Sequence, residues 1–244
     1  MRILTVGSGS TGNCYVIDAD GEYLMLECGM APTFMLDMIG YGVDRVQACL
    51  VSHTHTDHAC YLKRYTVYGF PIYMSEEASE KAKDLGVKQI KRKKKYRAGG
   101  FTFASFAVPH DGTECDGFLV EHAAFGKLLF LTDLEYCPIN LSKIGVNHLM
   151  VECNYDRQWL TDAPNIDHIC KGHMEVETAL RLAHTLGDSL EDIGLIHLSV
   201  MNGNGDEFKG RFQNEFPNCN IWIAQKGTIY AETEKESIQK NTDN

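Results

Sequence analysis

The sequence predicts a single domain of the mixed α/β class. Its 244 residues are 44% hydrophobic, which is enough to form one large core. Short apolar runs recur along the chain, and several of them end at a histidine or an aspartate. Folds of the α/β class place their sites at such strand ends. We therefore expect strand ends that carry imidazole and carboxylate groups toward one edge of a sheet.

Apolar runs rich in β-branched and aromatic residues predict the strands. They cover residues 2–6, 14–18, 23–28, 48–51, 71–74, 101–108, 118–122, 127–131, 149–153, 193–198, 221–224 and 228–231. Two pairs of runs are expected to form hairpins across short turns, namely 118–122 with 127–131 and 221–224 with 228–231. Helices are expected over 32–39, from a Ser75 cap to near Gly86, over 174–186 and over 207–216.

The domain organisation is simple. We expect one domain over residues 1–232 and a polar C-terminal tail over residues 233–244. No apolar run is long enough to span a membrane, and the N-terminus lacks a signal-peptide pattern. Nine cysteines without a Cys-x-x-Cys pair indicate reduced thiols. The expected location is therefore the cytoplasm, with no membrane partner.

The most informative stretch is Val51–His58, which follows an apolar run. His53 and His55 are two residues apart, so their side chains point the same way in an extended chain. After a turn, Asp57 and His58 would reach a neighbouring point. A lone loop histidine is usually a surface or hydrogen-bonding residue, but three imidazoles and a carboxylate within six residues favour a metal site. This donor set suits zinc, and also manganese or iron.

Three further strand ends supply the same chemistry. Predicted strands end just before His110 and Asp133, and the predicted strand over 193–198 contains His197 next to its last residue. Each of these residues alone would more often be structural. Together with the first stretch they complete a set of seven candidate ligands: His53, His55, Asp57, His58, His110, Asp133 and His197.

The pattern His-x-His-x-Asp-His over residues 53–58 resembles the signature of the metallo-β-lactamase superfamily, and the resemblance extends from about residue 2 to residue 231. Within it the chain is similar to the YycJ/WalJ-type exonuclease branch, in residues 7–15, 108–111, 117–118, 172–173 and 197–199. The resemblance implies an αββα four-layer sandwich, with two mixed sheets face to face and helices outside. Glu27 departs from the aspartate usual in the superfamily, and Tyr155 from the histidine usual in the branch.

The resemblance also implies two divalent metal ions, either Zn²⁺ or Mn²⁺, with iron as a further option. His53, His55 and His110 would hold the first ion, Asp57, His58 and His197 the second, and Asp133 would bridge them. Two ions about 3.5–4 Å apart would provide a metal-bound hydroxide at neutral pH. Asp57 is also a candidate to orient this nucleophile. His173 is a candidate to contact a phosphate or to protonate the leaving oxygen, and a purely hydrogen-bonding role at a helix start is an equally good interpretation.

Three functions fit this sequence. The first is a metal-dependent hydrolase that acts as a phosphodiesterase or exonuclease on DNA or RNA. The alternatives are a hydrolase of a small ester, thioester or lactam on the same fold, and a catalytically idle, metal-stabilised binding protein. The net charge of −10 argues against a large nucleic-acid-binding surface. The basic segment Lys88–Arg97 is the exception, and it is interpreted either as a solvated strand or loop or as a phosphate contact.

Overall fold

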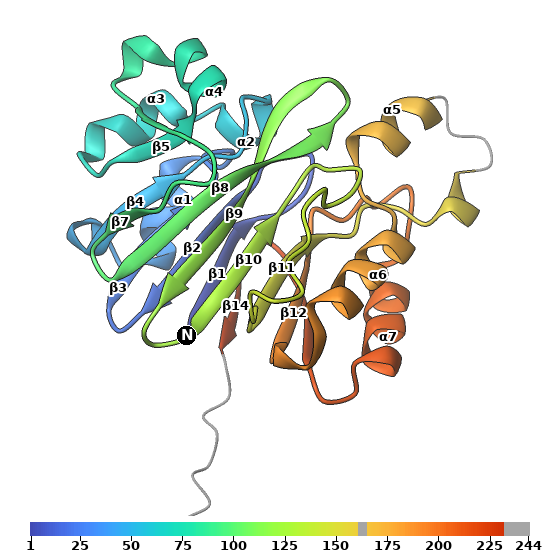
Figure 1. Cartoon of the computed structure of the whole chain (residues 1–244). Helices are drawn as coiled ribbons and strands as arrows, with labels where there is room; N and C mark the ends of the chain where they lie inside the picture. The colour runs from blue at the N-terminus through green and yellow to red at the C-terminus, as the bar shows by residue number, and fades with distance from the viewer. Residues whose placement is uncertain (161–164, 232–244) are drawn as a thin grey trace, which may run out of the picture.

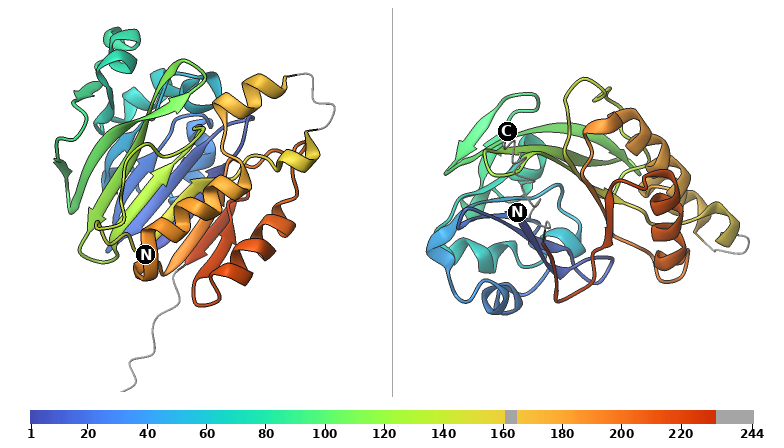
Figure 2. Two further views of the ribbon diagram at one scale, coloured as in Figure 1. Left: turned by 45° about the vertical axis from the view of Figure 1, so that its right-hand side comes forward. Right: turned by 90° about the horizontal axis from the view of Figure 1, so that it is seen from below.

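The computed structural model describes residues 1–160 and 165–231. Two seven-stranded sheets pack face to face, and helices cover the outer face of each sheet (Figure 1, Figure 2). This arrangement is the αββα four-layer sandwich, so the predicted fold class is confirmed. The predicted tail, residues 233–244, lies outside the described residues.

The first sheet contains the N-terminal strands. Its order is β14 (Thr228–Ala231), β1 (Arg2–Gly7), β2 (Cys14–Ala19), β3 (Glu22–Leu26), β4 (Val46–Leu50), β5 (Ile72–Ser75) and β6 (Lys88–Ile90). Strands β3 to β6 run parallel to one another, and the remaining pairs are antiparallel. The helices of this half are α1 (Pro32–Met38), α2 (Thr56–Ala59), α3 (Leu62–Tyr65) and α4 (Glu76–Lys81).

The second sheet contains the later strands. Its order is β13 (Asn220–Ile223), β12 (Asp192–Ile196), β11 (His148–Glu152), β10 (Gly126–Leu131), β9 (Thr113–His122), β8 (Phe101–His110) and β7 (Tyr96–Ala98). Strands β10 to β13 are parallel, and β7 to β10 are antiparallel. Its helices are α5 (Ile166–Gly172), α6 (Val176–Leu186) and α7 (Gly205–Glu215).

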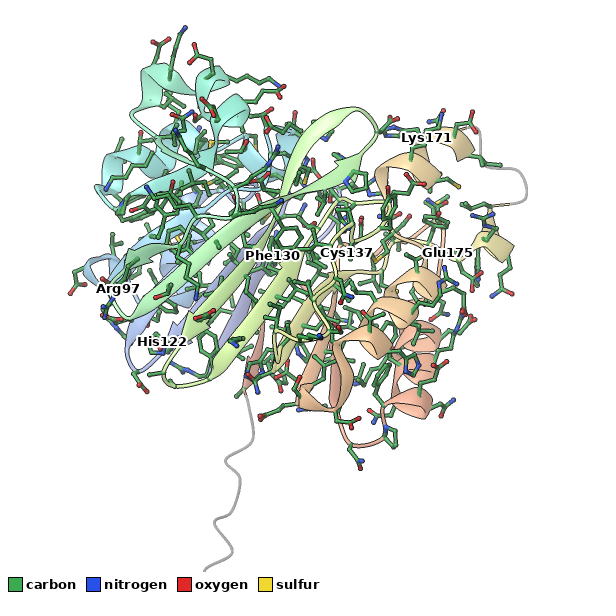
Figure 3. All side chains as sticks on the ribbon, viewed as in Figure 1. Arg97, His122, Phe130, Cys137, Lys171 and Glu175 are labelled. Carbon is green, nitrogen blue, oxygen red and sulfur yellow. The ribbon has the colours of Figure 1, made fainter. Side chains whose placement is uncertain are left out.

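Most of the hydrophobic core lies between the sheets and under the helices. Phe130 is fully buried between the sheets and meets the ring of Tyr15 edge-on at a centroid distance of 5.8 Å (Figure 3). Under α6, the predicted apolar face is confirmed: Val176, Ala179, Leu180 and Ala183 are all buried against the second sheet. The helical spacing of apolar residues in the sequence therefore accounts for the packing of α6 on the second sheet.

The predicted hairpin between 221–224 and 228–231 is wrong. Strand β13 pairs with β12 in the second sheet, whereas β14 pairs with β1 in the first. The short connection carries the chain from one sheet to the other, and Trp222 stacks on Tyr230 at 4.7 Å. Two apolar runs around a tight turn have the local pattern of a hairpin, but each of these runs completes the edge of a different sheet.

Helix α4 is shorter than predicted. Its cap is confirmed, because the Ser75 hydroxyl accepts a hydrogen bond from the Ala78 amide at 3.3 Å. The helix ends at Lys81, and a 3₁₀ turn over Lys83–Leu85 follows before Gly86, which has a φ of 71°. The helical pattern thus continues to Gly86 in two pieces.

Within the described residues, no helix combines the length and apolar character that crossing a bilayer would require. All nine cysteines lie in this part of the chain, and all are free thiols.

We predict that Phe130→Ala lowers the free energy of unfolding by about 3–5 kcal/mol, because it leaves a cavity between the sheets. Urea denaturation followed by circular dichroism measures this loss. Val67→Ala is the matched control, since Val67 is 78% exposed and its truncation is expected to change stability by less than about 0.5 kcal/mol. Equal losses in the two variants would contradict this account of the core.

Candidate metal centre

The local structure of residues 53–58 separates the side chains into two sets. The chain is still extended at His55, which has φ −60° and ψ 151° and caps α2. The single turn of α2 then begins, and the His58 amide donates to the His55 carbonyl at 3.0 Å. His53 and His55 therefore precede the turn, and Asp57 and His58 lie within it. This is the arrangement that the spacing predicts.

Strand direction explains how distant residues reach the same place. Strands β10, β11 and β12 are parallel neighbours, so their carboxyl ends share one edge of the second sheet. Asp133 follows β10, Glu152 ends β11, and His197 follows β12. Strand β8 runs in the same direction, because it is antiparallel to β9, which is antiparallel to β10. His110, the last residue of β8, therefore joins the same edge.

The Asp133 carboxylate lies at the middle of the cluster. Its Oδ2 atom is 3.6 Å from His53 Nε2, 3.3 Å from His58 Nε2 and 3.7 Å from His110 Nε2. Its Oδ1 atom is 3.4 Å from His197 Nε2. Four imidazoles thus direct the same ring nitrogen toward one buried carboxylate.

The structure brings all seven predicted residues together, in two overlapping groups. In each group the candidate ligand atoms lie within 4.8 Å of one another. The first group is His53, His55, His110 and Asp133, and the second is Asp57, His58, Asp133 and His197. Because Asp133 belongs to both groups, its carboxylate can bridge two neighbouring cations.

The electrostatics of the cluster depend on which carboxylates each ring faces. Burial, and then the nearby His58, lower the pKa of His53 well below its ordinary value, so this ring is neutral. Burial also lowers the pKa of His197, but Asp133, Asp57 and Glu152 outweigh it and raise that pKa to about 10. Without a cation, His197 therefore holds a proton that it shares with these carboxylates, at the place where a metal ion would bind. Metal binding would displace this proton.

The residues present fit a divalent metal. His53 Nε2 is buried and has no hydrogen-bond partner, and it points toward Asp133 at a distance too long for a hydrogen bond. A buried ring nitrogen without a partner is costly in a folded protein. Neutral imidazoles with carboxylates are the donor set of zinc and related ions. The described His and Asp clusters can therefore hold divalent metal.

Outer contacts orient the rings of the cluster. The Ser52 hydroxyl lies 2.8 Å from His53 Nδ1, and the Gly172 carbonyl accepts from His110 Nδ1 at 2.6 Å. Such partners fix the tautomer of a metal-binding histidine and leave its other nitrogen free.

Glu27, the departure noted in the sequence, lies directly behind the cluster. It is fully buried, its carboxylate accepts from the Ser52 amide at 3.2 Å, and Oε2 is 3.5 Å from His58 Nδ1. Its φ of 68° ends strand β3 two residues earlier than predicted. The longer acid therefore lies at ion-pair distance from the His58 ring without a hydrogen bond to its Nδ1 atom.

Glu152 is a residue that the sequence analysis did not single out. Its buried Oε1 lies 2.7 Å from His173 Nδ1 and 2.9 Å from His197 Nδ1, and Oε2 accepts from the amides of Leu134 and Met174. Glu152 thereby joins His173 to the cluster, and these two residues form a third group with Asp133 and His197. The signal in the sequence that could have identified Glu152 is its place as an acidic residue at the end of an apolar strand, similar to that of Asp133.

Asparagines complete the support on both sides. Asn13 Nδ2 lies 3.0 Å from His58 Nε2 and 3.3 Å from Asp57 Oδ2. Asn154 Nδ2 donates to the His197 carbonyl at 3.0 Å. Tyr155 is buried, and burial, followed by a hydrogen bond with Cys170, raises its pKa.

The comparison with known families agrees with this geometry. The metallo-beta-lactamase superfamily matches residues 7–163. The chain belongs to this superfamily, and its predicted place among metal-dependent hydrolases is confirmed at that level.

One relative is similar to the chain in sequence, and two solved structures are similar to it in fold. The chain is 26% identical to the exodeoxyribonuclease YycJ of Bacillus anthracis over 230 residues, which cover 83% of this chain and 84% of that protein. The fold is similar to that of YhfI from Bacillus subtilis, with a TM-score of 0.74, 19% identity and coverage of 94% and 98% of the two chains. Human tRNase Z, short form, gives a TM-score of 0.64 at 16% identity, with coverage of 95% and 99%. These two structural likenesses show the fold alone.

We predict that Gly29→Ala empties the cluster of metal while the fold persists. A Cβ atom at Gly29 would lie 1.7 Å from the Asp57 carbonyl oxygen, so the first turn of α2 must move. Elemental analysis of the purified protein, together with its unfolding curve, measures the effect.

Gly210→Ala is the control for this variant. Gly210 lies in α7 with nothing within 4 Å of the added carbon, so metal content should be unchanged and stability should rise by about 1 kcal/mol. Wild-type metal content in Gly29→Ala would show that metal binding does not depend on the close approach of Gly29 to Asp57.

Proposed function

We propose that this protein is a metal-dependent phosphodiesterase that hydrolyses DNA or RNA with two divalent metal ions. The observation that carries the proposal is the position of Asp133, whose carboxylate is shared by two groups of histidine and aspartate side chains. Structural metal sites usually close with four ligands, whereas two adjoining groups around one carboxylate are typical of paired catalytic ions.

Each side chain then has a role. We assign His53, His55 and His110 to the first ion, Asp57, His58 and His197 to the second, and Asp133 to both. When bound, such a pair of cations, either Zn²⁺ or Mn²⁺, would lower the pKa of water and stabilise charge on phosphate oxygens. Asp57 is the ligand whose side chain is most accessible among the acids of the cluster, at 21% exposed against 3% for Asp133. It is therefore placed to orient the attacking water.

His173 is assigned to the leaving group. Its ring is partly exposed, stacks on the His197 ring at 5.4 Å, and donates through Nδ1 to Glu152. Glu152 stabilises the protonated form of the ring and fixes its orientation, so Nε2 carries the proton available to a leaving oxygen. Glu152 acts through His173 and His197 as a positioning residue.

Two observations support a nucleic acid as the substrate. A relative that aligns with 83% of this chain is an exodeoxyribonuclease. In addition, a cavity of about 540 Å³ beside the β8–β9 tip joins His110 to the cations Arg92 and Lys171, and its lining also includes the acids Glu77, Asp111, Glu114 and Glu135 (Figure 3 labels Lys171 on α5). The basic segment therefore approaches the cluster from the β7 side of the sheet.

Within the basic segment, the paired and unpaired cations differ. Arg92 binds Asp116 at 2.7 Å and Glu114 at 2.5 Å, and Lys95 binds Glu121 at 3.2 Å. These contacts attach the segment to the second sheet. Lys91 and Lys93 are exposed. We assign the phosphate contacts to these two lysines.

We predict that hydrolysis of bis(p-nitrophenyl) phosphate and of a single-stranded oligonucleotide is lost in excess chelator and is restored by Mn²⁺ or Zn²⁺. His55→Ala should lower both activities by more than about 100-fold, because it removes a first-ion ligand. His184→Ala, which changes an exposed histidine paired with Glu215, should leave them unchanged. Full activity in excess chelator would contradict the proposal, and hydrolysis of esters but no phosphodiester would favour the small-substrate alternative.

We predict that Lys91→Glu/Lys93→Glu weakens oligonucleotide binding and makes it less dependent on salt. Loss of two phosphate contacts should reduce the slope of log K against log [salt] by about 1.4 for a single strand. Turnover of bis(p-nitrophenyl) phosphate should not change. Lys143→Glu/Lys209→Glu is the matched control, with the same change of charge at two exposed lysines outside the basic segment. Equal effects of the two double variants on binding would exclude a specific contact of Lys91 and Lys93 with phosphate.

A further inference from the structure

Two consecutive apolar side chains stand in solvent just after the cluster. Val200 is 97% exposed and Met201 is 82% exposed. They follow His197 by three and four residues, so their Cα atoms lie within about 11 and 14 Å of the His197 Cα atom. Both side chains therefore lie on the loop that directly follows a candidate metal ligand.

Hydrogen bonds hold the loop that carries these side chains. The Ser199 amide donates to the Asn154 carbonyl at 3.1 Å, and the Ser199 hydroxyl accepts from the Met201 amide at 3.3 Å. The Asn202 carbonyl accepts from the Asp156 amide at 3.0 Å. The backbone is therefore fixed while both apolar side chains face water, which is an unfavourable arrangement unless a ligand covers them.

An exposed aromatic ring lies on the adjoining segment. Trp159, in the 3₁₀ turn Arg157–Trp159, is 47% exposed. Its neighbours tie this turn to the loop and to α7, because the Asp156 amide donates to the Asn202 carbonyl and the Gln158 side-chain amide donates to Glu207 at 3.3 Å. Val200, Met201 and Trp159 together are called the apolar rim.

The charges around the apolar rim indicate what binds there. Asp206 and Glu207, both exposed, begin α7 a few residues after the loop. Asp206 lines one pocket with Val200 and Lys226, so charges of both signs flank the uncharged side chains of the rim. The two carboxylates at the start of α7 repel a phosphate chain there. The strand order of the second sheet puts Lys91 and Lys93 on the β7 side and the apolar rim on the β12 side, with the cluster between them.

We propose that the apolar rim stacks the terminal nucleobase of the substrate, while the rest of the nucleic-acid strand extends across the cluster toward Lys91 and Lys93. This inference rests on the proposed phosphodiesterase function and adds a specificity surface to it. A nucleobase has the flat apolar face that such a surface accepts, and stacking tolerates every base. The nucleotide on this side would be the one released.

The test compares oligonucleotides that carry a base or an abasic residue at the 5′-terminal or the 3′-terminal position. The wild type should cleave one base-containing end roughly tenfold more efficiently than its abasic counterpart, the lower range expected for one stacked base. Val200→Ser/Met201→Ser should lose this difference and cleave the abasic strand as the wild type does. Met201→Phe should keep it, and Val67→Ser, a matched exposed valine on another element, should have no effect.

The outcomes separate this inference from the proposed function. If phosphodiesters are cleaved but the wild type treats base and abasic ends equally, or the double variant keeps the preference, the apolar rim does not bind a base. If no phosphodiester is cleaved at all, both proposals fail. Sedimentation velocity supplies a further outcome: a wild-type dimer that becomes monomeric in the double variant would show that the apolar rim joins two copies of the chain, and would overturn base stacking.

Discussion

The contact between the buried Asp133 carboxylate and the imidazoles around it is the interaction on which the rest of the site depends. Four ring nitrogens face it at 3.3 to 3.7 Å. A buried carboxylate is costly to desolvate unless positive charge compensates for it. Burial raises the pKa of Asp133, but His197 and His58 outweigh burial and lower it well below its ordinary value. The carboxylate is therefore ionised, and it requires either shared protons or cations beside it.

The fold supplies this arrangement through the direction of its strands. Parallel strands of the second sheet present their carboxyl ends at one edge, and β4 of the first sheet brings the histidine-rich turn to the same edge. Three residues of the cluster and its support have left-handed backbone at or just beyond strand ends: Glu27 with φ 68°, Asp133 with φ 49° and His197 with φ 49°. Each such conformation costs about 1–3 kcal/mol and persists where surrounding contacts enforce it. The bond from the His197 amide to the Ser8 hydroxyl, at 2.9 Å, is one of these contacts. The regular sandwich behind these three residues keeps them in place.

Local sequence patterns were sufficient for most strands, for the α6 face and for bringing the seven candidate residues into view. Their role as ligands, and the number of ions, stay predictions. The sequence was insufficient where the outcome depends on tertiary pairing. The runs 221–224 and 228–231 have a hairpin pattern, and only the competition between two sheet edges separates them. Glu152 was missed for a related reason: one acid after an apolar run has no distinguishing spacing, and its importance comes from two histidines that are 21 and 45 residues away. Contacts of this range are not encoded in any local period.

Anomalous X-ray scattering from crystals of the metal-loaded protein locates the bound ions and their ligands. We expect two peaks about 3.5–4 Å apart with the Asp133 carboxylate between them, one beside His53, His55 and His110 and the other beside Asp57, His58 and His197. Absence of metal from this cluster, or metal bound only elsewhere on the chain, would contradict this expectation.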